Sequence, residues 1–182
     1  DQSKFSAQPA INTSTGALTF ELAADANGDV EVTATLSDDD GGDDTSASTT
    51  FTISIASIND PPTFTSGSST ISVDEDSGSY NQTWASDMYR GADNESDQAL
   101  TFNVSVGSSD QSKFSAQPAI NTSTGALTFE LAADANGDVE VTATLSDNDG
   151  GDDTSASTAF TISIASINDP PTFTSGSSTI SV

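Results

Sequence analysis

The chain of 182 residues contains no cysteine and no histidine. Without cysteine it has no disulfide bonds to stabilise its folded state. Without histidine it lacks the usual general base and the common protein ligand for zinc, copper and nickel. These two absences exclude Ser-His-Asp and Cys-His catalysis within the chain.

Basic residues are also scarce, with three Lys and Arg against 28 Asp and Glu, which gives a formal net charge of −25. Such a charge repels nucleic acid and anionic membrane surfaces. No apolar run is long enough to cross a bilayer, so neither nucleic acid nor direct membrane insertion is expected. Crowded carboxylates cost folding free energy unless cations neutralise them.

A long internal repeat is present. Residues 1–73 recur as residues 110–182 with two differences, Asp39 against Asn148 and Thr50 against Ala159. Such similarity at a period of 109 residues indicates a recently duplicated tandem array. Arrays of near-identical domains are usually selected for length, stiffness or multivalency rather than for a single chemical step.

The expected domain boundaries lie at the segments Asn59-Asp60-Pro61-Pro62 and Asn168-Asp169-Pro170-Pro171. Two successive prolines cannot donate to a sheet and favour an extended chain, which suits a short, stiff linker. Residues 1–60 are therefore interpreted as the C-terminal part of a preceding repeat, 61–169 as one complete repeat, and 170–182 as the first strand of a following repeat. We expect the two fragments to need neighbouring copies to complete their cores.

The complete repeat has the alternation of apolar and polar residues that is typical of half-buried strands. Turn-forming pairs such as Thr124-Gly125 and Asn136-Gly137 separate the alternating segments, and no stretch has a helical period. About seven short strands per repeat predict an all-β fold, a Greek-key β-sandwich of the immunoglobulin or cadherin type. The predicted strands are 70–73, 79–84, 100–106, 127–131, 139–145 and 160–164.

The acidic residues gather in the predicted loops together with Asn and Gly. Clusters follow the first strand at 74–76, lie between strands at 93–97, 134–138 and 147–153, and end the repeat at 168–169. Hard oxygen ligands without nitrogen or sulfur donors suit Ca²⁺ better than any transition metal. Each cluster alone is also explained as a solvated turn, but alternate loops of a sandwich meet at the same end. The run beginning at Asp147 is similar to the start of an EF-hand loop, yet it lacks the distal Glu and the flanking helices.

Four segments of the repeat carry a family resemblance. They are the acidic stretch around Glu75, the series from Phe114 through Thr124-Gly125 to Leu127, the loop Asp147-Asn148-Asp149-Gly150, and the run 167–173 with its Asn-Asp-Pro-Pro linker. Together they resemble, over the full repeat, the cadherin-like tandem repeats (immunoglobulin-like extender domains) of large bacterial surface adhesins of the repeats-in-toxin type. Two departures are a Ser at positions 57 and 166, where the family's linker has Asp, and the lack of a clear internal Asp-Arg-Glu motif.

The resemblance implies Ca²⁺ at each junction between domains, with ligands from both neighbouring repeats and from the linker. It also implies that Asp38 and Asp40 serve a junction upstream of residue 1. The change from Asp39 to Asn148 between the copies falls between the two better-placed Asp residues, which suggests that this middle position points outward. At the first junction the implied ligands are Asp25, Asp29, Asn59, Asp60, Asp93, Asn94, Glu95, Asp147 and Asp149. At the second junction they are Glu75, Asp134, Asp138, Asn168 and Asp169.

The function implied by the resemblance is that of a structural spacer in an extracellular adhesin on a bacterial surface, stiffened by Ca²⁺, with neighbouring repeats as its partners. The alternative is an adhesive module that binds carbohydrate or another surface ligand, for which Tyr89 is the best candidate contact. Trp84 more simply fills the sandwich core. An enzyme is not expected, because Glu130 and Glu140 lie on outward strand positions with no evident partner.

Overall fold

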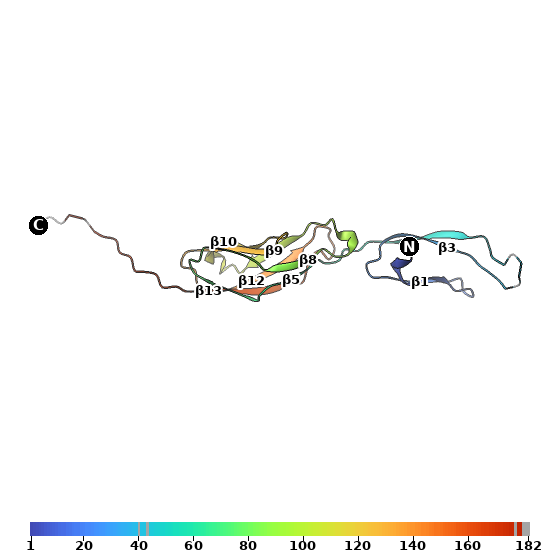
Figure 1. The fold of residues 1–182 in the computed structure, drawn as a ribbon, viewed down its shortest axis with the longest axis horizontal. Helices are drawn as coiled ribbons and strands as arrows, with labels where there is room; N and C mark the ends of the chain where they lie inside the picture. Colours follow the sequence, from blue (N-terminus) through green and yellow to red (C-terminus); the bar gives the residue numbers. More distant parts are fainter. Residues whose placement is uncertain (40, 43, 177, 180–182) are drawn as a thin grey trace. The chain divides into compact units, whose positions relative to one another are not determined.

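The computed structural model describes residues 1–39, 41–42, 44–176 and 178–179 (Figure 1). The chain divides into two compact units, Asp1–Asn59 and Asp60–Val182. The first unit contains the strands β1 (Phe5–Ile11), β2 (Leu18–Leu22), β3 (Gly28–Ala34) and β4 (Thr49–Ile55), with the short 3₁₀ helix η1 (Gln2–Lys4).

The second unit is an all-β sandwich with two short 3₁₀ helices, η2 (Asp93–Glu95) and η3 (Gln111–Lys113). One sheet has the order β10-β11-β7, the other β6-β13-β12-β9, and β5 pairs with β8. All pairs are antiparallel except β6 with β13. The strands are β5 (Thr63–Ser66), β6 (Thr70–Asp74), β7 (Ser79–Thr83), β8 (Ala85–Tyr89), β9 (Thr101–Val106), β10 (Phe114–Ile120), β11 (Ala126–Leu131), β12 (Gly137–Ser146) and β13 (Thr158–Ala165).

The core of this sandwich draws residues from both sheets, as the alternation predicts. Leu127 on β11 and Val139 and Ile162 on the opposite sheet are fully buried in one apolar cluster. Trp84 belongs to the same cluster, with its ring centroid 4.4 Å from that of Phe160, and its indole nitrogen donates to the Ser68 carbonyl. The expectation that Trp84 fills the core is confirmed.

All six predicted strands are present, and the described part of the unit contains three more, β5, β8 and β10. Pro118 lies within β10, where the pairing with β11 shifts register, so the segment lacks a clean alternation. Asp87 in β8 has a positive φ of 49° and lies where the pairing with β5 shifts register. The all-β sandwich is therefore confirmed, while the Greek-key connectivity stays a prediction.

The first unit repeats half of this sandwich. β1 and β2 pair in the same register as β10 and β11, and β3 and β4 pair as β12 and β13 do. β3 ends at Ala34, whereas β12 continues to Ser146 because it also pairs with β9. Beyond Asp169 the described residues contain no strand, and Phe173 is exposed there, unlike its counterpart Phe64, which packs on the core.

Candidate metal centre

Three carboxylates meet at the end of the second unit where β13 leads into the linker. Oxygens of Asp76, Asp134 and Asp169 all lie within 4.8 Å of one another. Parallel pairing of β6 with β13 brings the residues after both strands to this end. The turn before β12 reaches the same end, because Gly137 pairs with Ile164. The topology, rather than sequence proximity, therefore assembles the cluster.

Two of these aspartates occupy unusual backbone conformations. Asp76 has φ of 62° and Asp134 has φ of 56°, in the left-handed region that Asp and Asn tolerate better than most residues. The same conformation recurs at Asp25, which corresponds to Asp134 in the first copy. Residues held in sparsely populated conformations are a reason to look for a function at this site.

Glu75 lies beside the cluster and fastens the linker. Its side chain is buried, and its Oε1 accepts a hydrogen bond of 2.6 Å from the Ile167 backbone N–H. Its Oε2 accepts a longer bond of 3.4 Å from Asn136 Nδ2, and its own N–H donates to the Ala165 carbonyl. The segment just before Asn168 and Asp169 is thus tied to the turn that carries Asp76.

The electrostatics of the cluster are unfavourable when no cation is present. The pKa of Asp169 is raised above its ordinary value of 3.8, first by partial loss of hydration and then by the negative charges of Asp134, Asp76 and Glu75. A side-chain hydrogen bond with Asp134, which needs a proton on one of the two groups, raises the pKa of Asp169 further. Asp169 itself is exposed, so crowding by other carboxylates accounts for this shift better than burial does.

A second buried glutamate holds the linker at the opposite end of the unit. Glu95 accepts backbone hydrogen bonds of 3.0 Å from Asp60 to its Oε1 and of 3.0 Å from Ala92 to its Oε2. A Cβ at Gly91, where φ is 126°, would collide with this carboxylate. Glu75 and Glu95 therefore have equivalent roles at the two ends of the unit. The carboxylate of each accepts a hydrogen bond from a backbone N–H of a linker segment.

Polar side chains surround a hollow of about 240 Å³ next to Glu95. Asp147 is buried and its Oδ1 accepts from the Asp149 N–H, while Asp149 Oδ2 accepts from Gln98 Nε2 at 3.3 Å. Asn148 is exposed, but its Oδ1 accepts a 2.8 Å bond from the Ala99 N–H. The exposure of Asn148 agrees with the expectation that this middle position points outward. The hollow is lined by Asn94, Glu95, Asp97, Gln98, Asn148 and Asp149.

Of the ligands implied for the second junction, Asp134 and Asp169 belong to the carboxylate cluster. Asp138 is not in it; its Oδ1 accepts a 2.7 Å bond from Ser163 on β13, and Asp29 accepts in the same way from Ser54. Asn168 is exposed and donates to the Asp169 carbonyl. Asp76, the third member of the cluster, is not among the ligands that the resemblance implies. Its place directly after Glu75, in a turn that ends in Gly78, is the signal that could have identified it.

The remaining candidate ligands lie elsewhere. Asp93 and Asn94 are exposed on η2, and Asp25 and Asp38 are exposed in turns of the first unit. Asn59 is half-buried at the end of that unit, and Asp40 lies outside the described residues.

The candidates for adhesion and catalysis occupy separate places. Tyr89 is exposed, whereas Tyr80 stacks on Phe129 with ring centroids 4.7 Å apart. Met88 is half-buried, and Arg90 Nε donates to the Gln98 carbonyl. Of Tyr80, Trp84 and Tyr89, Tyr89 is therefore the one with an exposed ring. Glu130 and Glu140 are exposed on β11 and β12, which belong to different sheets.

No family model matches the chain, and no relative is found among curated proteins. Within the described part of the chain, no helix has the length and apolar character needed to cross a membrane.

Proposed function

We propose that the chain is part of a structural spacer in a bacterial cell-surface adhesin, and that Ca²⁺ bound at the junctions between repeats stiffens the array. The observation that carries this proposal is the cluster of Asp76, Asp134 and Asp169 at the start of the Asn168-Asp169-Pro170-Pro171 linker. The nearly exact repetition of the chain supports a role based on length rather than on a single active site.

The donor set fits Ca²⁺. This ion takes six to eight oxygen ligands at about 2.3–2.6 Å, so any two oxygens bound to it lie no more than about 5 Å apart. The carboxylate oxygens of the three aspartates lie within 4.8 Å of one another, which satisfies that limit. Three carboxylates leave further coordination positions, which water, Glu75 or groups of a following repeat would fill.

Binding would act mechanically. Without the ion, the carboxylates of Asp76, Asp134 and Asp169 repel one another, which favours separation of the linker from the domain. With the ion bound, Asp169 in the linker is joined to two turns of the domain. The free energy of binding then appears as resistance of the junction to bending and unfolding. Millimolar extracellular Ca²⁺ is sufficient for sites of the weak extracellular class.

The first test is a calcium titration of the full chain by isothermal calorimetry, with Asp134→Asn and Glu140→Gln compared under the same conditions. Both variants remove one negative charge, but Glu140 lies exposed on β12, outside the cluster. We expect Asp134→Asn to lower affinity about tenfold or more and Glu140→Gln to leave it unchanged. Equal weakening by the two variants, or no saturable binding to the unmodified chain, would reject the metal site.

The second test is small-angle X-ray scattering on a polypeptide of several whole repeats, in a chelator and then in added Ca²⁺. A reversible rise of the maximum dimension toward that of domains joined end to end supports the spacer. No change in shape would reject stiffening even if Ca²⁺ binds. The alternative of an adhesive module rests on the single exposed ring of Tyr89, which is not enough to favour it.

A further inference from the structure

β6 and β13 form the one parallel pair among the described strands of the second unit. They lie side by side from the pair of Thr70 with Thr161 to the pair of Asp74 with Ala165. β6 is the second strand of the unit and β13 is its last described strand. The pair therefore joins the beginning of the folded repeat to its end.

Hydrogen bonds connect these two strands over their whole length and beyond. At one end the Thr161 N–H donates to the Ser69 carbonyl at 2.9 Å, and at the other end the Glu75 N–H donates to the Ala165 carbonyl at 2.9 Å. The Glu75 carboxylate adds a further link, because its Oε1 accepts from the Ile167 N–H at 2.6 Å. The connection thus runs from the residue before β6 to the segment after β13.

The backbone groups of β6 fall into two sets. In a parallel pair, every second residue of a strand turns its N–H and C=O toward the same neighbour. Ser69 and Glu75 bond to β13, so Ile71 and Val73 between them face β13 as well. Ser72 faces the other way, where the described part of the chain places no strand beside β6. A proline at position 73 therefore removes a donor to β13, whereas a proline at position 72 does not.

The two linkers leave the unit at opposite ends of this pair. Glu95 accepts from the Asp60 N–H at one end, and Glu75 accepts from the Ile167 N–H at the other. The chain passes from Asp60 through β5 and β6 to Glu75, and β13 runs in the same direction as β6. Tension on the linkers therefore pulls β6 back toward Asp60 and β13 forward toward Asp169. The two strands are pulled past each other along their length.

The direction of the pull decides how such a ladder of hydrogen bonds fails. When the strands are pulled along their length, the bonds share the force and must break together. When one end is pulled sideways, the bonds break one after another. Forced unfolding is governed by the unfolding rate rather than by the equilibrium free energy. A few bonds that share the force can therefore determine resistance to tension while they contribute little to thermodynamic stability.

β5 precedes β6 in the path of the force, but its pairing is less regular. The register of β5 with β8 shifts between Thr63 and Thr65. Release of β5 alone frees the chain only as far as Ser69, whose carbonyl is the first acceptor of the ladder with β13. The pairing of β6 with β13 must therefore break before the unit can open between its two linkers.

We propose that residues 69–75 and 161–167, which we call the strand clamp, are a mechanical clamp that resists tension along the array. This inference rests on the proposed function only in that a spacer of an adhesin is pulled along its length. The hydrogen bonds of the strand clamp involve no metal. Ca²⁺ at the proposed centre would join the same two segments again, through Asp76 and Asp169, so the strand clamp is tested in a chelator.

Force spectroscopy on the full chain tests the dependence on direction. The chain has no cysteine, so two introduced cysteines define the points of attachment. Pro61→Cys with Pro170→Cys pulls the strand clamp along its length. Ser77→Cys with Pro170→Cys holds the chain just after β6 and just after β13, and so peels the two strands apart from one end. At equal loading rate we expect the first pair to need about twice the force of the second, or more. Equal forces would overturn the proposal.

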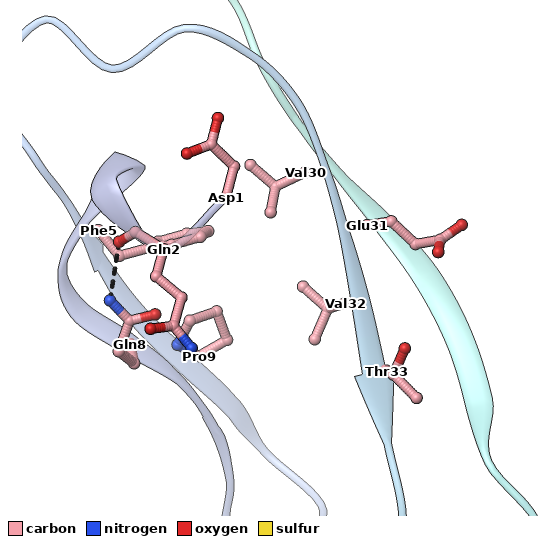
Figure 2. Close-up of a pocket in the computed structure, with 9 residues that line it drawn as sticks. All are labelled: Asp1, Gln2, Phe5, Gln8, Pro9, Val30, Glu31, Val32 and Thr33. Carbon is pink, nitrogen blue, oxygen red and sulfur yellow. Dashed lines mark hydrogen bonds between the residues drawn. The ribbon is translucent and has the colours of Figure 1, made fainter.

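Both attachments leave the first unit outside the loaded segment, because that unit ends before residue 61. Figure 2 shows Phe5, Val30 and Val32 of the first unit around a hollow of about 330 Å³ between β1 and β3. These side chains take no part in the strand clamp. Unfolding of the first unit therefore adds no event to the force record.

Three substitutions in β6 locate the force within the strand clamp. Val73→Pro removes a donor to β13, and Val73→Ala is the control for the apolar packing that Val73→Pro also loses. Ser72→Pro puts the same ring one residue away, on the open edge. We expect Val73→Pro to lower the rupture force between the linkers by about half or more, and the two controls to lower it much less. Equal rupture forces for Val73→Pro and Ser72→Pro would overturn the proposal.

A core variant separates the strand clamp from general stability. Phe129→Ala removes a buried ring from β11, which belongs to the other sheet, and leaves the hydrogen bonds between β6 and β13 in place. Urea unfolding gives the free energy of each variant. We expect Phe129→Ala to lose more free energy of unfolding than Ser72→Pro and yet to keep a higher rupture force than Val73→Pro. A rupture force that simply follows the free energy of unfolding across the variants would overturn the proposal.

The comparison of pulling directions needs no change inside the strand clamp, so it decides the question even where Val73→Pro fails to fold. The force experiments contain no Ca²⁺. Their failure would therefore leave the proposed metal site untouched, and failure of calcium binding would leave the strand clamp untouched.

Discussion

At the scale of single residues, Asp169 carries the clearest electrostatic prediction. Its pKa is raised in the folded chain, so the folded state binds a proton more readily than the unfolded state. In a chelator, its charge therefore lowers stability above its folded pKa, and this loss is relieved as the pH falls through the raised pKa toward 3.8. We expect Asp169→Asn to be more stable than the unmodified chain at pH 7, with a difference that shrinks on acidification.

Urea unfolding followed by Trp84 fluorescence measures this difference at several pH values, and Glu140→Gln is the control for a general reduction of charge. In saturating Ca²⁺ the order should reverse, because the variant has lost an oxygen ligand of the ion. An Asp169→Asn chain that is less stable than the unmodified chain in chelator at neutral pH would contradict the repulsion inferred here.

Glu75 and Glu95 support a prediction about hydrogen bonding. Replacing either by Ala leaves a linker N–H, that of Ile167 or of Asp60, without its acceptor. Loss of a buried hydrogen bond to a charged group costs about 1.5–3 kcal/mol, so each variant should lower the unfolding free energy of the second unit by roughly that amount. Hydrogen exchange at the Ile167 and Asp60 amides reports the loss directly. Glu130→Ala, on an exposed strand position, should change little.

At the scale of strands, the twin copies allow one substitution to be measured in two environments. Phe129→Ala removes a ring that packs against Tyr80 and Phe114, and should destabilise the second unit by about 3–5 kcal/mol. Phe20→Ala removes a half-exposed ring whose described aromatic contact is Phe5, so we expect a cost of about 1 kcal/mol or less. Unfolding of each unit is followed by hydrogen exchange in its own strands. Equal destabilisation by the two substitutions would mean that Phe20 is as well buried in solution as Phe129.

The strands also show how far the sequence predicts the fold. Clean alternation identified β9, β11, β12 and β13, because an apolar face and a polar face leave a period of two. β10 was missed because Pro118 falls at an irregular pairing, and β8 because Asp87 takes a positive φ. Pairing between distant strands, such as β6 with β13, leaves no local pattern in the sequence, so it could not be predicted from periodicity.

The candidate site was predictable in part for the same reason. Composition and spacing selected Asp134 and Asp169, which lie in an acidic turn and in the linker. Assembly of the cluster depends on which turns meet at one end of the sandwich, and that is a property of topology. Asp138 is a candidate only because of its acidic sequence neighbours. It lies on β12, where its side chain accepts a hydrogen bond from Ser163 of the adjacent strand. A position inside a strand fixes the direction of its side chain, whereas a turn leaves more freedom.

At the scale of the whole molecule, the charge of −25 predicts a dependence on ions that can separate screening from binding. Sodium chloride shortens the Debye length from about 30 Å at 0.01 M to about 10 Å at 0.1 M. Because this screens the repulsion between carboxylates, NaCl should raise the stability of the fold gradually, with no saturation at low salt concentration. A specific Ca²⁺ site instead stabilises the folded state by an amount that rises with the logarithm of the ratio of free Ca²⁺ to the dissociation constant. This stabilisation begins when the Ca²⁺ concentration approaches that constant.

We therefore expect millimolar CaCl₂ to raise the melting temperature more than NaCl of equal ionic strength. We expect Asp134→Asn to remove most of this additional rise in melting temperature. The excess should appear in the second unit, whose unfolding Trp84 reports, because the carboxylate cluster belongs to that unit. MgCl₂ is an informative third salt, because Mg²⁺ gives up its water reluctantly and demands octahedral geometry. If the three salts coincide at equal ionic strength, the acidic residues act only through their summed charge, and stiffening of the array needs another cause.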